Sequence, residues 1–438
     1  MQLHSFSPRT ATAVVIANMI GTGVFTSLGF QLLEIQSGFV LMMLWMVGGL
    51  TALCGALCYA ELGAALPRSG GEYNFLSRIY HPGAGYISGW VSATIGFAAP
   101  TALAAITFGT YLASVLPWFS PTWLACALVV TLTAVHASSR RNSGWVQRAF
   151  TVLKIALILV FCVLSWLFVS EPQEVRFLPS AGDGVLLTSA AFAVALIYVN
   201  YAYAGWNAAT YLTSELTDPQ KNLSRVLVIG TAVVMLLYLL LNFTFLYVAP
   251  MDAMAGKIEI GYVSAQYAFG TGGAAAMGVV LALLLISTVS AMVLAGPRVL
   301  QVIGEDFPAF RLLARTNRHG VPDLAVALQS VLALSFIITA SFESILVFAG
   351  FTLGLNTFFT VLGVFVLRWR QPDLPRPYRI SLYPLPPLIF LGFTGWTLTY
   401  ILLQRPVEGL MGLAIVASGG ACYGLTVWFG RTRPAPAS

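Results

Sequence analysis

The sequence predicts an all-α membrane protein with twelve transmembrane helices, arranged as a 5+5 inverted repeat followed by two C-terminal helices. Of the 438 residues, 58% are hydrophobic and only 9% are charged, whereas about a quarter are charged in soluble domains. Apolar runs of about 18 residues or more, enough to cross roughly 30 Å of hydrocarbon, recur along the whole chain. Glycine-rich or polar segments interrupt the first and the sixth of these runs, which predicts two broken helices.

The predicted spans follow one another with short loops, of which the longest is expected at 298–323. Glycine and proline cluster in several of these loops, for example at 67–71 and 372–377. The first repeat, 11–169, holds spans at 11–33, 38–61, 84–113, 122–137 and 147–169. The second repeat, 186–367, holds spans at 186–212, 224–249, 272–297, 323–341 and 343–367. The last two spans lie at 382–403 and 407–429, so residues 1–438 are expected to form one transmembrane domain.

The distribution of basic residues predicts the orientation in the membrane. If the N-terminus is cytoplasmic, 18 of the 22 Lys and Arg residues fall on the cytoplasmic side. This asymmetry follows the positive-inside rule, so we expect a multi-pass protein of the cell membrane (inner or plasma membrane) with both termini in the cytoplasm. The net charge of +6 therefore reflects topology and the lipid bilayer, and we expect no nucleic-acid partner. The two broken spans are five helices apart, which is the spacing expected when five spans are repeated in inverted orientation.

The first break is centred on Gly21-Thr22-Gly23. Backbone groups without partners are costly in hydrocarbon, so such a break persists where it lines a polar cavity. The half-helix that follows begins with free N–H groups at the positive end of its dipole, which is a site for an anion. We expect the N–H groups of Thr22, Gly23 and Val24 to bind a carboxylate and the carbonyl of Met19 to face a cation. The alternative is that the small residues only allow close helix packing.

The second break lies between Tyr201 and Asn207. We expect the carbonyls released at Tyr201, Ala202 and Ala204 to complete a receptor for a zwitterion, built from main chain. Asn207 has two open roles, because its amide can bond a bound solute or can satisfy a freed carbonyl.

Lys154 stands within the fifth span, where a cation is costly and by default indicates function. We expect its ammonium to reach the freed carbonyls of the first span and to take the place of a monovalent metal ion; proton coupling through this group is a further hypothesis. The alternative is that the side chain extends to the cytoplasmic interface. Tyr238 is a candidate to hydrogen-bond near Lys154, or to pack without a functional role.

Other classes of function find less support in the sequence. An intramembrane enzyme needs a nucleophile with a base, or a metal cluster, within the spans. The five cysteines lie in apolar runs and the four histidines are dispersed, so we expect no catalytic residue, no metal and no cofactor. A channel would require a charged ring or a carbonyl filter, usually formed by several copies. We therefore favour a carrier and retain the channel as the alternative from a different class.

Four motifs in order resemble the amino acid–polyamine–organocation (APC) superfamily, and in particular its L-type amino acid transporter branch. The segment 21–25 resembles that family's G-[ST]-G-[IV]-F break, and 202–207 is close to the L-type A-Y-x-G-W-N. The segment 215–223 resembles the loop E-x-x-x-P-x-[KR]-N-[LI]. The fifth-span pattern consists of Gln147, Phe150 and Lys154. The order and number of spans match over nearly the whole chain.

This resemblance implies a leucine-transporter-type fold and sodium-independent movement of amino acids. It implies that the amides of Thr22 and Gly23 bind the α-carboxylate and that the carbonyls of Met19, Tyr201 and Ala204 bind the α-amine, with the Tyr201 side chain as inner gate. Ala291 stands where arginine and agmatine carriers of the family have tryptophan, and no acid is expected in the pocket. These two departures favour a neutral amino acid as substrate.

Animal L-type chains bond an ancillary glycoprotein through a cysteine in the loop after their third span. The corresponding loop here, 114–122, contains no cysteine, so we expect no disulfide-linked ancillary subunit. The sequence thus predicts a sodium-independent secondary transporter of neutral L-amino acids that works by alternating access. Exchange of one amino acid for another is the favoured mode, and proton-coupled symport is the alternative.

Overall fold

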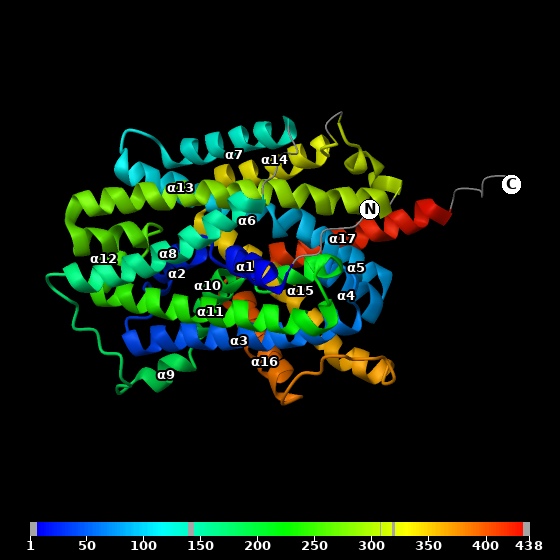
Figure 1. Ribbon diagram of the computed structural model, residues 1–438, viewed down its shortest axis with the longest axis horizontal. Coiled ribbons are helices and arrows are strands. Elements are labelled where there is room, and N and C mark those ends of the chain that lie inside the picture. The colour runs from blue at the N-terminus through cyan, green and yellow to red at the C-terminus, as the bar shows by residue number, and fades with distance from the viewer. Residues whose placement is uncertain (1–6, 139–143, 307, 318–319, 432–438) are drawn as a thin grey trace.

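The computed structural model describes residues 7–138, 144–306, 308–317 and 320–431, and within these ranges it contains helices and no strand (Figure 1). The long helices run roughly side by side through the molecule. They are α3 (Gly38–Ala65), α6 (Ala98–Val115), α7 (Pro121–Ser138), α8 (Gly144–Phe168), α11 (Pro219–Val248), α13 (Ile260–Asp306, with a kink at Gly270), α14 (Asp323–Thr339), α15 (Phe342–Arg370), α16 (Leu385–Gln404) and α17 (Pro406–Arg431).

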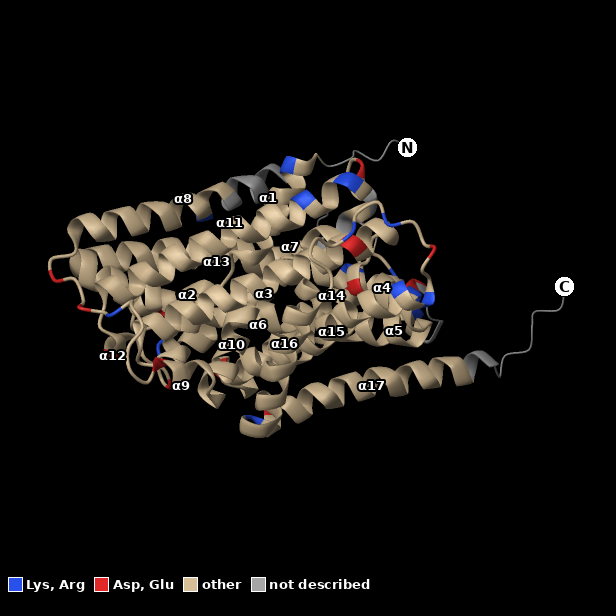
Figure 2. Ribbon diagram, turned by 90° about the horizontal axis from the view of Figure 1, so that it is seen from below, with Lys and Arg blue, Asp and Glu red and all other residues tan. Residues whose placement is uncertain are grey.

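The chain is a multi-pass membrane protein. In the described residues, eight helical segments are long and apolar enough to cross a membrane, and four shorter apolar helices accompany them. Most charged residues lie toward the two ends of the long helices (Figure 2). Each of the twelve predicted ranges overlaps a helix. The exact count of twelve spans and the 5+5 repeat stay predictions.

Both predicted breaks are present in the backbone. The first span consists of α1 (Pro8–Met19) and α2 (Gly23–Gln31), separated by three residues that are not helical. The sixth consists of α10 (Ala190–Tyr203), a turn at 204–207 and the 3₁₀ helix η2 (Ala208–Glu215). The third span is also irregular, because α5 (Pro82–Val91) and α6 are joined by the π-helical turn η1 (Ser92–Gly96).

Serine residues begin four of the spans. The hydroxyl oxygens of Ser7, Ser37, Ser189 and Ser341 each accept a backbone N–H from the residue three positions later, at 3.1–3.3 Å. An N-cap of this kind satisfies one of the N–H groups that the first turn of a helix leaves free. Residue type at the helix start therefore fixes where α1, α3, α10 and α15 begin.

The predicted loop at 298–323 is wrong in its first part. Helix α13 continues through Pro297 to Asp306, and the 3₁₀ helix η3 (Pro308–Ala314) follows. A proline in the interior of a membrane helix is tolerated when neighbouring groups satisfy the freed carbonyl. The remaining short helices are α4 (Gly71–Ile79), α9 (Asp183–Leu187) and α12 (Met251–Met254), and they lie at the two ends of the bundle.

A buried ion pair joins α3 to α15 at the end of the molecule that carries α4 and α5, called the basic end below. Glu61 of α3 is only 1% exposed. Arg368 of α15 donates to both of its carboxylate oxygens, through Nε at 2.7 Å and Nη2 at 2.6 Å. The backbone N–H of Ile380 adds a third donor at 2.8 Å, and the Arg368 guanidinium stacks on the ring of Tyr383. This bidentate geometry anchors the loop after α15 on the second span.

We predict that Glu61→Gln destabilises the fold by about 3 kcal/mol, because it leaves the Arg368 guanidinium without its carboxylate. The measurement is thermal unfolding of the purified protein in detergent. Glu171→Gln, in an exposed loop, is the matched control and should unfold at the wild-type temperature. Equal unfolding temperatures for the two variants would contradict the prediction.

Candidate functional site

The two broken helices meet backbone to backbone. A Cβ on Gly23 of α2 would lie 2.5 Å from the Cα of Ala202 in α10. A Cβ on Gly205, in the second break, would lie 2.9 Å from the carbonyl carbon of Asn18 in α1. Contacts this close are possible only for glycine. The interruptions that the sequence places about 180 residues apart therefore form one site.

At the first break the hydrogen-bonding pattern of α1 stops within two residues. The N–H of Ile20 still bonds the Ile16 carbonyl at 2.9 Å, but the N–H of Gly21 turns to the Met19 carbonyl at 2.8 Å. Helix α2 then begins at Gly23, and the Phe25 N–H bonds the Thr22 carbonyl at 3.0 Å. The N–H groups of Gly23 and Val24, which precede it, have no carbonyl within the helix to bond and lie at its positive end. Thr22 and Val24 are buried here, at 4% and 0% exposure.

At the second break the chain leaves the helical conformation at Ala204, where ψ is 144°. Gly205 follows with φ of +100°, a left-handed conformation that favours glycine. The N–H of Ala204 bonds the Tyr201 carbonyl at 3.0 Å. The Tyr201 side chain interacts with the side chain of Thr22, so the predicted gating tyrosine of the sixth span lies at the break of the first.

Tyr238 of α11 joins the two breaks. Its hydroxyl lies 2.5 Å from the Met19 carbonyl oxygen and 3.1 Å from that of Ala202. The phenol is fully buried. The Met19 carbonyl thus faces two donors, Tyr238 and the N–H of Gly21, so both of its lone pairs are used in this conformation. The expected hydrogen bond of Tyr238 is therefore directed at the broken helices themselves.

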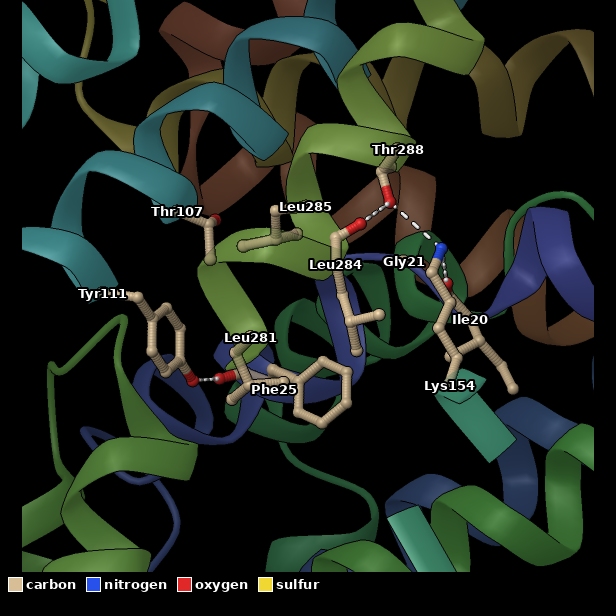
Figure 3. Close-up of a pocket in the computed structure, with 10 residues that line it drawn as sticks. All are labelled: Ile20, Gly21, Phe25, Thr107, Tyr111, Lys154, Leu281, Leu284, Leu285 and Thr288. Atoms are coloured by element: carbon tan, nitrogen blue, oxygen red, sulfur yellow. Dashed lines mark hydrogen bonds between the residues drawn. The ribbon is translucent and has the colours of Figure 1, made fainter. Parts of the chain in front are cut away.

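Lys154 of α8 is buried, at 7% exposure, and points toward the first break (Figure 3). Its Nζ donates to the Ile20 carbonyl at 2.9 Å and to Thr288 Oγ1 of α13 at 3.0 Å. None of the ion pairs among the described residues includes Lys154. The side chain therefore extends inward and satisfies a freed carbonyl, and it does not reach the membrane interface.

A small cavity lies beside Lys154 and the first break (Figure 3). Its walls come from the first span and from α6, α8 and α13, and Gly21 and Thr288 are among the lining residues. The space is large enough for about one water molecule. A ligand the size of an amino acid needs a wider conformation of this site.

Of the predicted site residues, Gly21 and Lys154 line this cavity and the other ten do not. Ala291 is half-buried on α13, one turn after Thr288, and it does not line the cavity. Asn207 donates to the carboxylate of Glu72 in α4. In this conformation its amide therefore serves neither of the two expected roles, which were to bond a freed carbonyl or a bound solute. Glu72, which is 2% exposed, adjoins the second break through its bond with Asn207 and does not line the cavity. The expectation that no acid lies in the pocket stays a prediction.

Broken helices that meet inside a membrane-crossing bundle are typical of secondary transporters. The chain belongs to the amino acid permease family, whose model matches residues 6–416. Members of this family are transporters, so the protein is a transporter and not an enzyme.

Curated relatives agree with this assignment. The large neutral amino acids transporter small subunit 2 of Homo sapiens is 30% identical over 450 residues, which cover 96% of this chain and 80% of the relative. The b(0,+)-type amino acid transporter 1 of Mus musculus is 26% identical, covering 95% and 86%. The Asc-type amino acid transporter 1 of Homo sapiens is 28% identical, covering 97% and 82%.

These relatives correct one expectation. A small subunit, as the first relative is named, is one chain of a larger assembly. The prediction that no disulfide-linked ancillary subunit accompanies this chain is therefore wrong. It rested on the absence of cysteine from the single loop 114–122, and one loop cannot exclude a partner that is held elsewhere on the surface.

We predict that Gly23→Ala disrupts the site and that Gly21→Ala does not. The new Cβ at position 23 would meet the Ala202 backbone and force the two breaks apart, whereas at position 21 the nearest atom within 4 Å is the Met19 carbonyl oxygen at 3.9 Å. The measurement is the yield of monodisperse protein in size-exclusion chromatography. Gly23→Ala should lose most of it and Gly21→Ala should match wild type; equal yields would contradict the packing described above.

Proposed function

We propose that the protein is a sodium-independent secondary transporter of neutral L-amino acids that exchanges one amino acid for another by alternating access. The observation that carries this proposal is the backbone contact of the two breaks at Gly23–Ala202 and Gly205–Asn18. It sets the free N–H groups of one half-helix beside the released carbonyls of the other, a pattern complementary to a zwitterion. A relative named for large neutral amino acids supports the neutral substrate class.

The proposed substrate contacts follow the backbone polarity of the site. The N–H groups of Thr22, Gly23 and Val24 bind the α-carboxylate, and the carbonyls of Tyr201 and Ala204 bind the α-amine. Gly21 and Ala202 line the proposed site between these groups, and their small size lets the ligand approach the backbone. The Met19 carbonyl joins the amine site only when the Tyr238 hydroxyl gives way, because Tyr238 occupies it in this conformation.

Lys154 supports sodium independence, because its ammonium occupies the position between Ile20 and Thr288 in which a monovalent cation would otherwise bind carbonyl and hydroxyl oxygens. A buried lysine outside any ion pair of the described residues is also able to exchange a proton. This observation favours proton-coupled symport as the second candidate mode.

We propose that the twelve helical ranges are twelve spans of one transmembrane domain, related as 5+5 with two further spans. The breaks fall in the first and the sixth spans, which is the offset of an inverted repeat. The basic end faces the cytoplasm of the cell membrane under the positive-inside rule. Ala291, on the span that also carries Thr288, is proposed to set the size of the opened pocket.

The transport mode is tested by counterflow in proteoliposomes that contain the purified protein. The panel holds the twenty amino acids together with agmatine and putrescine. We expect saturable counterflow of neutral amino acids, no counterflow of the two polyamines, and no uptake into vesicles that lack an internal amino acid. Uptake into empty vesicles driven by a pH gradient would favour proton symport over exchange, and ion currents without counterflow would indicate a channel.

We predict that Lys154→Ala lowers the counterflow rate at least tenfold, because it leaves the Ile20 carbonyl unsatisfied in the membrane and removes the fixed cation. Thr288→Val, which removes one of the two acceptors, should have a smaller effect in the same direction. Lys257→Ala, at an exposed position, is the control. A Lys154→Ala protein that folds and retains more than half of the wild-type rate would refute the role given to this lysine.

A further inference from the structure

Glu72 is a buried carboxylate that collects three hydrogen bonds at the basic end. Tyr59 of α3 donates to Oε1 at 3.0 Å, and Tyr211 of η2 donates to Oε2 at 2.6 Å. The Asn207 amide, in the second break, also donates to Oε1. Glu72 itself lies in the first turn of α4, a short helix outside the long bundle. One side chain thus connects α4 with the second and the sixth spans.

The backbone before Glu72 is shaped for this contact. Gly70 and Gly71 have φ of +118° and +51°, which favours glycine at both positions. A Cβ on Gly71 would lie 2.6 Å from the ring of Tyr211. The Gly70-Gly71-Glu72 segment therefore brings the start of α4 against η2 and presents the carboxylate to the hydroxyl of the same tyrosine.

The rest of α4 is held by a different part of the molecule. Helix α4 packs mainly on α5 and α15. A Cβ on Gly85 of α5 would lie 2.3 Å from Ser77, and one on Gly363 of α15 would lie 2.9 Å from Ile79. Arg370 of α15 donates to the Ile79 carbonyl at 3.1 Å. Glu72 thus sits at a boundary, with the third and tenth spans behind α4 and the broken sixth span in front of it.

The opposite end of the molecule is closed by aromatic rings. Phe30 of α2 stacks on Tyr198 of α10 and on Phe342 of α15, with centroid distances of 5.8 and 5.6 Å. All three side chains are buried, and the Tyr198 hydroxyl donates to Glu343 at 2.7 Å. In this conformation the rings pack at one end, the hydrogen bonds of Glu72 are made at the other, and the cavity beside Lys154 has space for about one water molecule. We call this arrangement the closed form below.

We propose that Glu72 is the latch of the basic end: its carboxylate holds the Asn207–Tyr211 segment against α4 and must release it when the transporter opens to that side. The inference rests on the proposed transport function, because alternating access moves the broken helices relative to the helices behind α4. Glu72 acts through Asn207 and Tyr211 and is a positioning residue. It does not touch the proposed substrate site.

The test is Glu72→Gln, which keeps the shape of the side chain but replaces one acceptor oxygen by a donor. We expect the closed form to lose about tenfold in population against the form open at the basic end, since one hydrogen bond to a charged group is worth about that factor. The KM for a counterflowing amino acid should then fall on the basic-end side and rise on the opposite side. Tyr211→Phe should shift both KM values in the same directions, by less.

Three comparisons give this test its controls. Glu174→Gln, at an exposed position of the opposite end, should leave both KM values unchanged. The double variant Glu72→Gln/Tyr211→Phe should not exceed Glu72→Gln by the full effect of Tyr211→Phe, because the two residues share one hydrogen bond. A Glu72→Gln protein that is less heat-stable but keeps the wild-type ratio of the two KM values would overturn the latch and leave Glu72 a structural residue.

Hydrogen–deuterium exchange tests the latch without relying on transport. In Glu72→Gln, exchange should rise in residues 204–215 and fall in residues 30–37, because opening at one end excludes opening at the other. A rise confined to 71–79 and 204–215 would overturn the latch. Wild-type protein that moves no amino acid while this exchange pattern holds would refute the proposed substrate and retain the latch.

Discussion

The polar backbone at the two breaks is the constraint on which the rest of the molecule depends. Each interruption of a membrane helix releases N–H and carbonyl groups that hydrocarbon cannot satisfy. The structure meets this demand with side chains from other spans. Lys154 donates to the Ile20 carbonyl, and the Tyr238 hydroxyl lies within hydrogen-bonding distance of the Met19 and Ala202 carbonyls. The fifth and seventh spans are therefore positioned partly by the polar needs of the first and sixth.

Glycine makes this arrangement possible because it has no side chain at the points where two backbones touch. At Gly23 and Gly205 the neighbouring chain is closer than any Cβ would allow. Under the proposed function, those contacts also bring the free end of α2 and the released carbonyls of α10 close enough to bind the two ends of one small molecule. Close packing and the proposed ligand recognition are then compatible consequences of the same glycines.

Local sequence was enough to predict both breaks and to place Lys154 in the bundle, because a glycine-rich interruption and a lysine are rare in apolar runs. It could not show the partners of Tyr238, since the carbonyls it contacts lie 219 and 36 residues away. It also gave no reason to single out Glu72. Its burial comes from Tyr59, Asn207 and Tyr211, which only the tertiary fold brings together.

A carrier has to release what it binds, and the hydrogen bonds of the closed site explain how this can be achieved. Under the proposed function, an α-amine that approaches the Met19 carbonyl displaces the Tyr238 hydroxyl and does not fill an empty acceptor. Binding then exchanges one hydrogen bond for another, so its net free energy is smaller than the number of contacts suggests. When the ligand leaves, Tyr238 returns and no carbonyl is stranded in the membrane. The same tyrosine thus stabilises the empty site and limits the affinity of the occupied one.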